Sequence, residues 1–317
     1  MPPLLSLCSI EFTPWQLNKP VFNLNLTCYA KESTPRELLR AEFRNIINAY
    51  DDAVFIYTDG SKKESGVGCA FVVGDSDYSW SLQSFASIFF AELYAIFQAL
   101  LFIRMSHNGN NFVIVTDSLS ALKSLQAMCP NEPMVRMVGE LLHVILLSGK
   151  QIVFIWVPGH IGIEGNERAD KAAGHGVDGN SVDVSVCRHK DVIRHLKSLV
   201  YNKWQNDWQH NESFLRRIKP LIKPWNQPII FNRLEQVKLA RLHIGHTQLT
   251  SGYLLKREPR PVCLGCEVHL TVMHILLDCE LYANERQLHN ISCLDDAYAN
   301  PVNLIEFFKC IDLFHQL

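Results

Sequence analysis

The apolar stretch from Phe85 to Met105 is the feature that most limits what this chain can fold into. It is long enough to cross a membrane, but Glu92 and Gln98 lie within it and a strand-like segment follows closely. A helix that is apolar nearly all round is also typical of a protein interior. The sequence therefore predicts a buried helix of a soluble domain, and no membrane partner.

Glu92 is the acidic side chain of this predicted helix. A lone buried carboxylate costs several kcal/mol unless it is paired with a cation or bound to a metal ion. A structural partner on the same helix, Arg104, lies twelve positions further on, which is more than three helical turns away. We therefore expect an external cation to compensate Glu92.

Strand and helix patterns surround this helix in a simple order. Three strands joined by short turns predict an antiparallel meander, and later strands alternate with helices. The order βββαβααβα predicts a mixed five-stranded sheet with helices on its faces, an α/β fold. The expected strands are residues 54–59, 66–73, 79–85, 112–117 and 151–157, and the expected helices follow Phe85, Ser118, Pro133 and Glu164.

Two aspartates end neighbouring apolar strands. Asp59 lies in Tyr-Thr-Asp-Gly-Ser and Asp117 in Val-Thr-Asp-Ser. Open α/β sheets place their sites at the carboxyl ends of strands, so both side chains are candidates for one site. The alternative is that one is a turn residue and the other a helix cap.

The strongest motif runs from Trp156 to Asp170, Trp-Val-Pro-Gly-His-Ile-Gly-Ile-Glu-Gly-Asn-Glu-Arg-Ala-Asp. Together with Thr58-Asp59-Gly60-Ser61, Glu92 and Thr116-Asp117-Ser118 in the same order, it closely resembles type 1 ribonuclease H. More narrowly, it is similar to the ribonuclease H domain that follows the reverse transcriptase in non-LTR (LINE-like) retrotransposons. The resemblance spans about 125 residues and includes all four acidic positions of the family.

The resemblance implies that four carboxylates hold metal ions, namely Asp59, Glu92, Asp117 and Asp170. Converging carboxylates repel one another, so such a site favours hard cations, most naturally two Mg²⁺ about 4 Å apart, with Mn²⁺ as an alternative. The family also implies that His160 assists protons or product release, although a loop histidine alone is usually just solvated. Asn166 and Glu167 are expected to start the last helix and support Asp170, without chemistry of their own.

The implied activity is endonucleolytic hydrolysis of the RNA strand of an RNA–DNA hybrid to a 5′-phosphate and a 3′-hydroxyl, with no small-molecule cofactor. Backbone groups near Gly60 and Ser61 are expected to contact the 2′-hydroxyls that distinguish RNA. One departure from some family members is the loop 128–133, which is short and not basic. We therefore expect hybrid affinity to depend on other parts of the chain.

A second metal pattern lies near the C-terminus. Cys263-x2-Cys266-x7-His274-x4-Cys279 has the ligand types and number of a closed tetrahedral zinc site. His269 competes for the third position, and Cys279 could instead be a buried apolar cysteine. Basic residues precede the pattern and favour nucleic-acid contact, with protein contact or a solvated helical face as alternatives: Arg233, Lys238, Arg241, Lys256, Arg257 and Arg260.

Charge and composition suggest three parts. The formal net charge is −2, yet between Arg188 and Arg260 Lys and Arg outnumber Asp and Glu by about ten, as phosphate contacts favour. We expect a connector resembling the tail of a reverse transcriptase at 1–50, the ribonuclease H domain at 51–178, and a mainly α-helical basic domain at 179–317. Ten scattered cysteines and the lack of a signal sequence predict an intracellular protein, with nucleus and cytoplasm left open.

Three rival functions remain at this point. A catalytically silent remnant would bind nucleic acid without cutting it. A 3′–5′ exonuclease shares the sheet and the metal chemistry, but would need an Asp-x-Glu pair on the first strand, where position 61 is serine. A pure interaction module built on residues 181–317 would not need the carboxylates.

Overall fold

The computed structural model describes residues 17–107, 109–127, 132–179, 182–224 and 231–317. These residues form two compact units that divide between Lys197 and Ser198. The division falls within helix α6 (His189–Gln209). Each unit has a hydrophobic core of its own, so each is described by itself.

The first unit is built on a six-stranded sheet in the order β1-β6-β5-β2-β3-β4. Strands β2, β3 and β4 form the antiparallel meander, while β1, β6, β5 and β2 run parallel to one another. The strands are β1 (Val21–Asn23), β2 (Val54–Lys63), β3 (Gly66–Val73), β4 (Ser76–Leu82), β5 (Asn111–Thr116) and β6 (Gln151–Trp156). The expected mixed sheet is confirmed, and so is the order of its elements.

The expected number of five strands is wrong, because β1 adds a sixth at the edge next to β6. This strand comes from the segment expected to be a connector. Its three residues are too few to show the alternation that marks a strand in sequence. Residues 1–16 of the expected connector lie outside the described residues.

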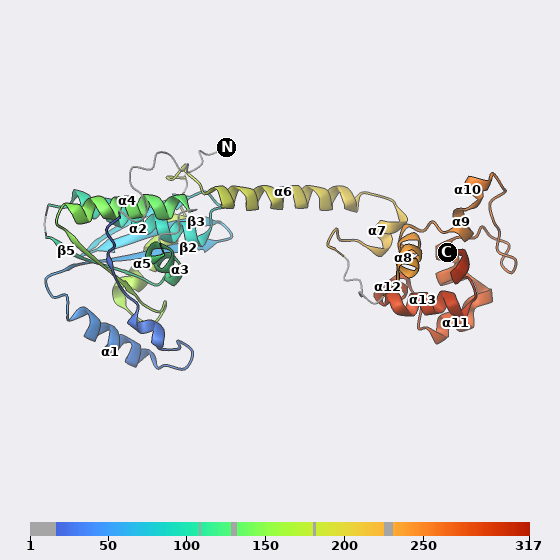
Figure 1. The fold of residues 1–317 in the computed structure, drawn as a ribbon, viewed down its shortest axis with the longest axis horizontal. Coiled ribbons are helices and arrows are strands. Elements are labelled where there is room, and N and C mark those ends of the chain that lie inside the picture. The colour runs from blue at the N-terminus through green and yellow to red at the C-terminus, as the bar shows by residue number, and fades with distance from the viewer. Residues whose placement is uncertain (1–16, 108, 128–131, 180–181, 225–230) are drawn as a thin grey trace. The chain divides into compact units, whose positions relative to one another are not determined.

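Helices cover both faces of the sheet (Figure 1). Helices α2 (Ile88–Met105), α3 (Leu119–Gln126) and α4 (Pro133–Leu147) pack on the face that presents Ile56, Ile114 and Phe154. On the other face, α1 (Arg36–Ile47) packs against Val113 and Val115, and α5 (Glu164–Val177) packs against Ala70 and Val72. The alternation of side chains along each strand therefore supplies two separate apolar surfaces.

Helix α2 is the predicted buried helix. Among the described residues it is the one helix whose length and hydropathy would suffice to cross a membrane. Nine of its residues are nevertheless buried, and all of them except Glu92 belong to the main core between the sheet and α4. Ser87 caps its first turn by accepting a hydrogen bond from the backbone of Phe90.

The second unit is mainly helical, as predicted. Its core includes Leu239, Leu242, Ile275, Leu304 and Phe308. Its elements are α7 (Phe214–Ile218), α8 (Arg233–Ile244), α9 (Gln248–Ser251), α10 (Tyr253–Lys256), the π-helical turn η3 (His274–Asp278), η4 (Glu280–Tyr282), α11 (Ala283–Leu288), α12 (Leu294–Ala299), α13 (Pro301–Cys310) and η5 (Phe314–Gln316).

The basic residues of this unit have different environments. Lys238 is buried, and its ammonium group donates hydrogen bonds to the backbone oxygens of Phe314 and His315. Arg241 donates to the backbone oxygen of Leu317 at 2.8 Å. These two cations therefore hold the C-terminal residues in place.

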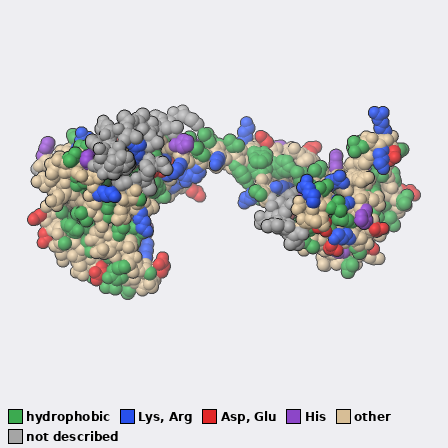
Figure 2. Space-filling model, in the orientation of Figure 1, with side chains coloured by type: hydrophobic (Ala, Val, Ile, Leu, Met, Phe, Trp, Pro, Cys, Tyr) green, Lys and Arg blue, Asp and Glu red, His purple; other side chains and the backbone are tan. Residues whose placement is uncertain are grey.

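Figure 2 shows that hydrophobic side chains, more than basic ones, gather along α6, where Val200 and Trp204 are 66% and 58% exposed.

Candidate active site

Asp59 and Asp117 lie side by side because of the register of two parallel strands. Thr58 of β2 pairs with Thr116 of β5, and each aspartate is the next residue along the chain. The chain then turns away after Asp117, where Ser118 donates its backbone N–H to the Thr116 hydroxyl at 3.2 Å. Asp117 therefore lies just past the end of β5, whereas Asp59 lies within β2, which continues to Lys63. The expectation that both aspartates end strands is wrong for Asp59, because β2 continues beyond it in its pairing with β3.

Glu92 reaches the same point from the second turn of α2. Carboxylate oxygens of Asp59, Glu92 and Asp117 all lie within 4.8 Å of one another. The close approach depends on Gly60, since a Cβ atom there would lie 2.9 Å from the backbone nitrogen of Glu92. Helix α2, which is apolar nearly all round, therefore places its one carboxylate, Glu92, beside those of Asp59 and Asp117.

Burial and mutual repulsion make this cluster unfavourable for negative charge. Burial, followed by the charges of Asp117 and Asp170, raises the pKa of Asp59 to about 8. The pKa of Glu92 is raised well above its ordinary value by burial and then by Asp59, and burial also raises the pKa of Asp117. One buried oxygen of Asp59 and one of Glu92 have no hydrogen-bond partner in the described part of the chain. Carboxylate oxygens in this state are the donor set that a hard divalent cation would take.

Asp170 and His160 form a second group beside the first. Asp170 on α5, His160 and Glu167 offer ligand atoms within 4.8 Å of one another. Asp170 is near enough to raise the pKa values of Asp59 and Asp117, although burial is the larger cause for both. His160 lies on the loop between β6 and α5 in a left-handed conformation, with its side chain 67% exposed. The five expected residues therefore occur as two adjoining groups.

Asn166 has a closer connection to the site than sequence reasoning assigned to it. It was expected only to start α5, but its side chain hydrogen-bonds the Asp117 carboxylate and it is 2% exposed. Its own side-chain oxygen has no partner among the described residues. The signal available in sequence was its spacing, because residues four apart share one face of a helix and Asp170 lies four positions on.

Two further residues hold Asp117 in place. The indole N–H of Trp156 donates to the backbone oxygen of Asp117 at 2.9 Å. Gly159 lies directly over the carboxylate, since a Cβ atom there would be 2.5 Å from Asp117 Oδ2. Glycine in the Pro-Gly-His segment is therefore required by contact with the site.

The C-terminal cluster brings together the four residues that the spacing predicted. Ligand atoms of Cys263, Cys266, His274 and Cys279 lie within 4.8 Å of one another. The competing His269 lies instead in an isolated β-bridge with Val262. The first two cysteines follow that bridge in a tight turn, where Cys263 donates its backbone N–H to Val268 and Glu267 donates to Cys263.

The thiols of this cluster interact strongly. Burial opposes ionisation of Cys263, but hydrogen bonds from His274 and from backbone N–H groups outweigh it and lower its pKa to about 6. Burial and the neighbouring Cys263 raise the pKa of Cys279 to about 11. His274 Nε2 is buried without a hydrogen-bond partner in the described residues. Three sulfurs and one imidazole nitrogen this close together have the chemistry of a tetrahedral zinc site.

A comparison with known families covers the part of the chain that contains the first site. Residues 51–178 match the ribonuclease H family, whose description is RNase H. The matched stretch contains Asp59, Glu92, Asp117, Asp170 and His160, and it excludes the cysteine cluster. Residues 51–178 are therefore similar to ribonuclease H, and the converging carboxylates lie within the matched residues.

Proposed function

We propose that this protein is a metal-dependent endonuclease that hydrolyses the RNA strand of RNA–DNA hybrids. The observation that carries the proposal is the convergence of Asp59, Glu92 and Asp117 within the residues that match ribonuclease H. Three converging carboxylates, two of them buried and the third half-buried, are costly for a folded protein unless they bind a cation. The match to the family supports the substrate class, and the carboxylate cluster supports the binding of metal ions.

Four carboxylates would hold Mg²⁺ or Mn²⁺, namely Asp59, Glu92, Asp117 and Asp170. When bound, the two ions would lower the pKa of a water molecule and stabilise the charge that develops on the leaving oxygen. No small-molecule cofactor is proposed.

The other groups of the site act on orientation and on protons. Asn166 hydrogen-bonds the Asp117 carboxylate and keeps it in one orientation, while Trp156 fixes the Asp117 backbone through its oxygen. His160, exposed on its loop, is placed to exchange protons with solvent or to assist product release. Backbone groups at Gly60 and Ser61 are proposed to contact the RNA 2′-hydroxyl beside the scissile phosphate. The loop 128–133 was singled out because it is short and not basic, but most of it lies outside the described residues.

We further propose that the chain comes from a non-LTR retrotransposon polyprotein and acts inside the cell. In this view residues 1–50 are the connector from a reverse transcriptase, residues 51–178 the nuclease, and residues 179–317 a basic domain that follows it. The order of motifs supports this origin, as does the cysteine cluster downstream of the nuclease.

The second metal site is proposed to hold structural Zn²⁺ through Cys263, Cys266, His274 and Cys279. Metal analysis of the purified chain should find one zinc that is lost in Cys263→Ser, while Cys310→Ser keeps it. Cys310 is an exposed cysteine outside the cluster and therefore controls for the chemical change. Equal zinc content in the two variants would contradict the assignment.

The test of the nuclease is cleavage of a labelled RNA–DNA hybrid in Mg²⁺ and in EDTA, with double-stranded RNA and double-stranded DNA as controls. Wild type should cut only the RNA of the hybrid, only with metal, and Asp117→Asn should lose this activity. Asp52→Asn, an exposed aspartate of the same domain, should keep it. Binding of the hybrid without any cleavage would instead support the catalytically silent remnant.

A further inference from the structure

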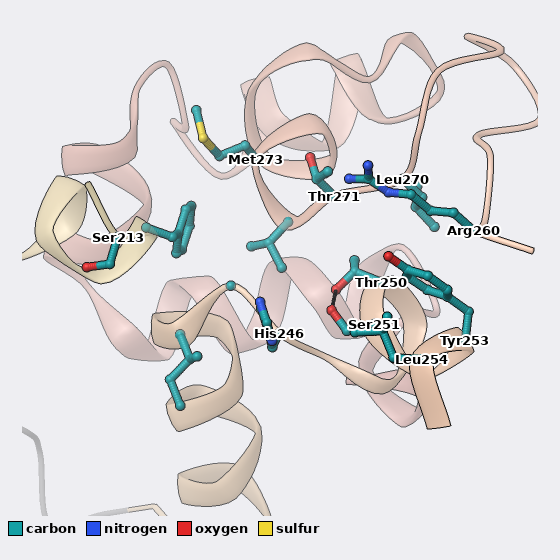
Figure 3. Close-up of a pocket in the computed structure, with 14 residues that line it drawn as sticks. Ser213, His246, Thr250, Ser251, Tyr253, Leu254, Arg260, Leu270, Thr271 and Met273 are labelled. Carbon is teal, nitrogen blue, oxygen red and sulfur yellow. Dashed lines mark hydrogen bonds between the residues drawn. The ribbon is translucent and has the colours of Figure 1, made fainter. Parts of the chain in front are cut away.

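The second unit contains a groove that the nuclease does not use. Five short segments line a cavity of about 550 Å³, which is within the range of binding sites for small ligands or single nucleotides. They are the start of α7, the end of α8, the short helices α9 and α10, Arg260 after α10, and residues 270–273 just before His274 (Figure 3). The groove lies entirely within residues 213–273, in the second unit.

The residues that line this groove favour an anionic ligand with an apolar part. They include the cation Arg260 and the imidazole of His246, but no aspartate or glutamate. The hydroxyl groups that line the groove belong to Ser213, Thr250, Ser251, Tyr253 and Thr271. The apolar side chains belong to Phe214, Ile244, Leu254, Leu270, Val272 and Met273.

Arg260 is available to a ligand, unlike two other basic residues of this unit. Its side chain is exposed and makes no ion pair or hydrogen bond within the described part of the chain. Lys238 and Arg241, by contrast, are occupied by backbone oxygens near the C-terminus. Figure 3 shows Arg260 and Tyr253 together at one end of the groove, with Ser213 and Met273 at the other.

The walls of the groove are held in place before any ligand arrives. Gly245 ends α8 at a φ of 78° and lies under Phe214, where a Cβ atom would come within 2.8 Å of the ring. Thr247 and Thr250 exchange backbone and hydroxyl hydrogen bonds of 3.2 Å, which shapes the opposite wall. A rigid groove binds more tightly than a mobile one, because less side-chain freedom is lost.

One wall is also continuous with the cysteine cluster. Thr271 accepts a hydrogen bond of 3.0 Å from the backbone of His274, the imidazole ligand of that cluster. Leu270 donates its backbone N–H to Pro261, next to Arg260. A metal ion in the cluster would therefore fix the wall that carries Arg260.

We propose that this groove binds single-stranded nucleic acid, with a phosphate at Arg260 and a base against the ring of Tyr253. Single strands are recognised by a cationic groove and aromatic rings, because every base offers a face for stacking. RNA and DNA strands share this chemistry, and the experiment separates them. The inference does not depend on the nuclease, since none of the lining residues belongs to the carboxylate site.

The test uses the full chain carrying Asp117→Asn, so that no substrate is cut. Fluorescein-labelled single-stranded RNA and DNA oligonucleotides of one sequence are titrated, with fluorescence anisotropy as the readout. The matched pair is Arg260→Gln, in the groove, and Arg257→Gln, also an exposed arginine but one that does not line it. Tyr253→Leu tests stacking, and the thermal transition of each variant checks that it folds.

We expect Arg260→Gln and Tyr253→Leu each to raise the Kd by about 5-fold or more, as removal of a phosphate contact or a stacked base does. Arg257→Gln should change it by less than about 2-fold, and the salt dependence of binding should weaken only in Arg260→Gln. Equal losses in the two arginine variants, or no affinity for either oligonucleotide, would overturn the proposal. Cleavage of the hybrid by the chain without Asp117→Asn is measured separately, so failure of the nuclease and failure of the groove are distinguishable.

Discussion

Gly60 of β2 lies so close to α2 that a Cβ atom at this position would be 2.9 Å from the backbone nitrogen of Glu92. The same Cβ atom would lie 3.0 Å from Cβ of Ala91. Glycine therefore lets the helix approach the strand, and this approach brings Glu92 to Asp59 and Asp117.

Gly60→Ala should consequently reduce hybrid cleavage by displacing Glu92. Overpacking of a tight contact costs about 1–3 kcal/mol, so the free energy of unfolding should fall by that amount as well. Denaturant unfolding and single-turnover cleavage measure the two effects. Gly174→Ala is the control, because its Cβ atom would meet only the end of Lys63 at 3.7 Å and alanine favours the helix. Full activity in Gly60→Ala would refute the role of this contact.

Asn166→Ala should lower kcat by about 10- to 100-fold with little change in KM, as loss of a hydrogen-bonded group behind a metal ligand does. The Asp117 carboxylate would lose a partner that holds its orientation. Single-turnover and steady-state cleavage of the hybrid separate kcat from KM. Asn202→Ala, on the exposed surface of α6, should leave both constants unchanged. A change confined to KM would point instead to substrate binding.

The metal-free protein should become less stable as the pH rises from about 4 to about 8. Burial raises the folded-state pKa of Asp59 to about 8, so over this range the folded state binds more protons than the unfolded state. Each unit of pKa shift corresponds to about 1.4 kcal/mol, and repulsion from Asp117 acts in the same direction. Chemical denaturation in EDTA at several pH values measures the trend, which Asp59→Asn should flatten. Added Mg²⁺ should restore stability most strongly at high pH.

Leu39→Ala should destabilise the first unit by about 2–5 kcal/mol, although residue 39 lies before the matched ribonuclease H stretch. Leu39 is fully buried in the core that α1 forms with Val113, Val115 and Ile155. Its neighbour Leu38 is 43% exposed, and Leu38→Ala should cost far less. Thermal or denaturant unfolding gives the comparison. Equal effects would mean that α1 is only a connector lying on the domain.

Local patterns in the sequence determined most of the first unit. The alternation of apolar residues and the helix apolar all round predicted the order of elements, and local context made Asp59, Glu92 and Asp117 candidate carboxylates, because these features involve only a few neighbouring residues. Asp170 was expected only from the resemblance to ribonuclease H. The spacing of Cys263, Cys266, His274 and Cys279 likewise predicted a cluster whose ligand atoms lie close together. Each of these patterns involves residues that lie close together in the sequence.

Only the tertiary structure decided which distant residues meet. The three residues of β1 are too short to be recognised until β6 lies beside them. In the sequence Lys238 is part of a basic run, but in the structure it is buried and hydrogen-bonded to the C-terminal backbone. The contact between Asn166 and Asp117 joins α5 to the residue after β5, and the groove around Arg260 is assembled from five segments. Such contacts depend on how elements far apart in the chain pack, and no short-range period or spacing in a single sequence encodes them.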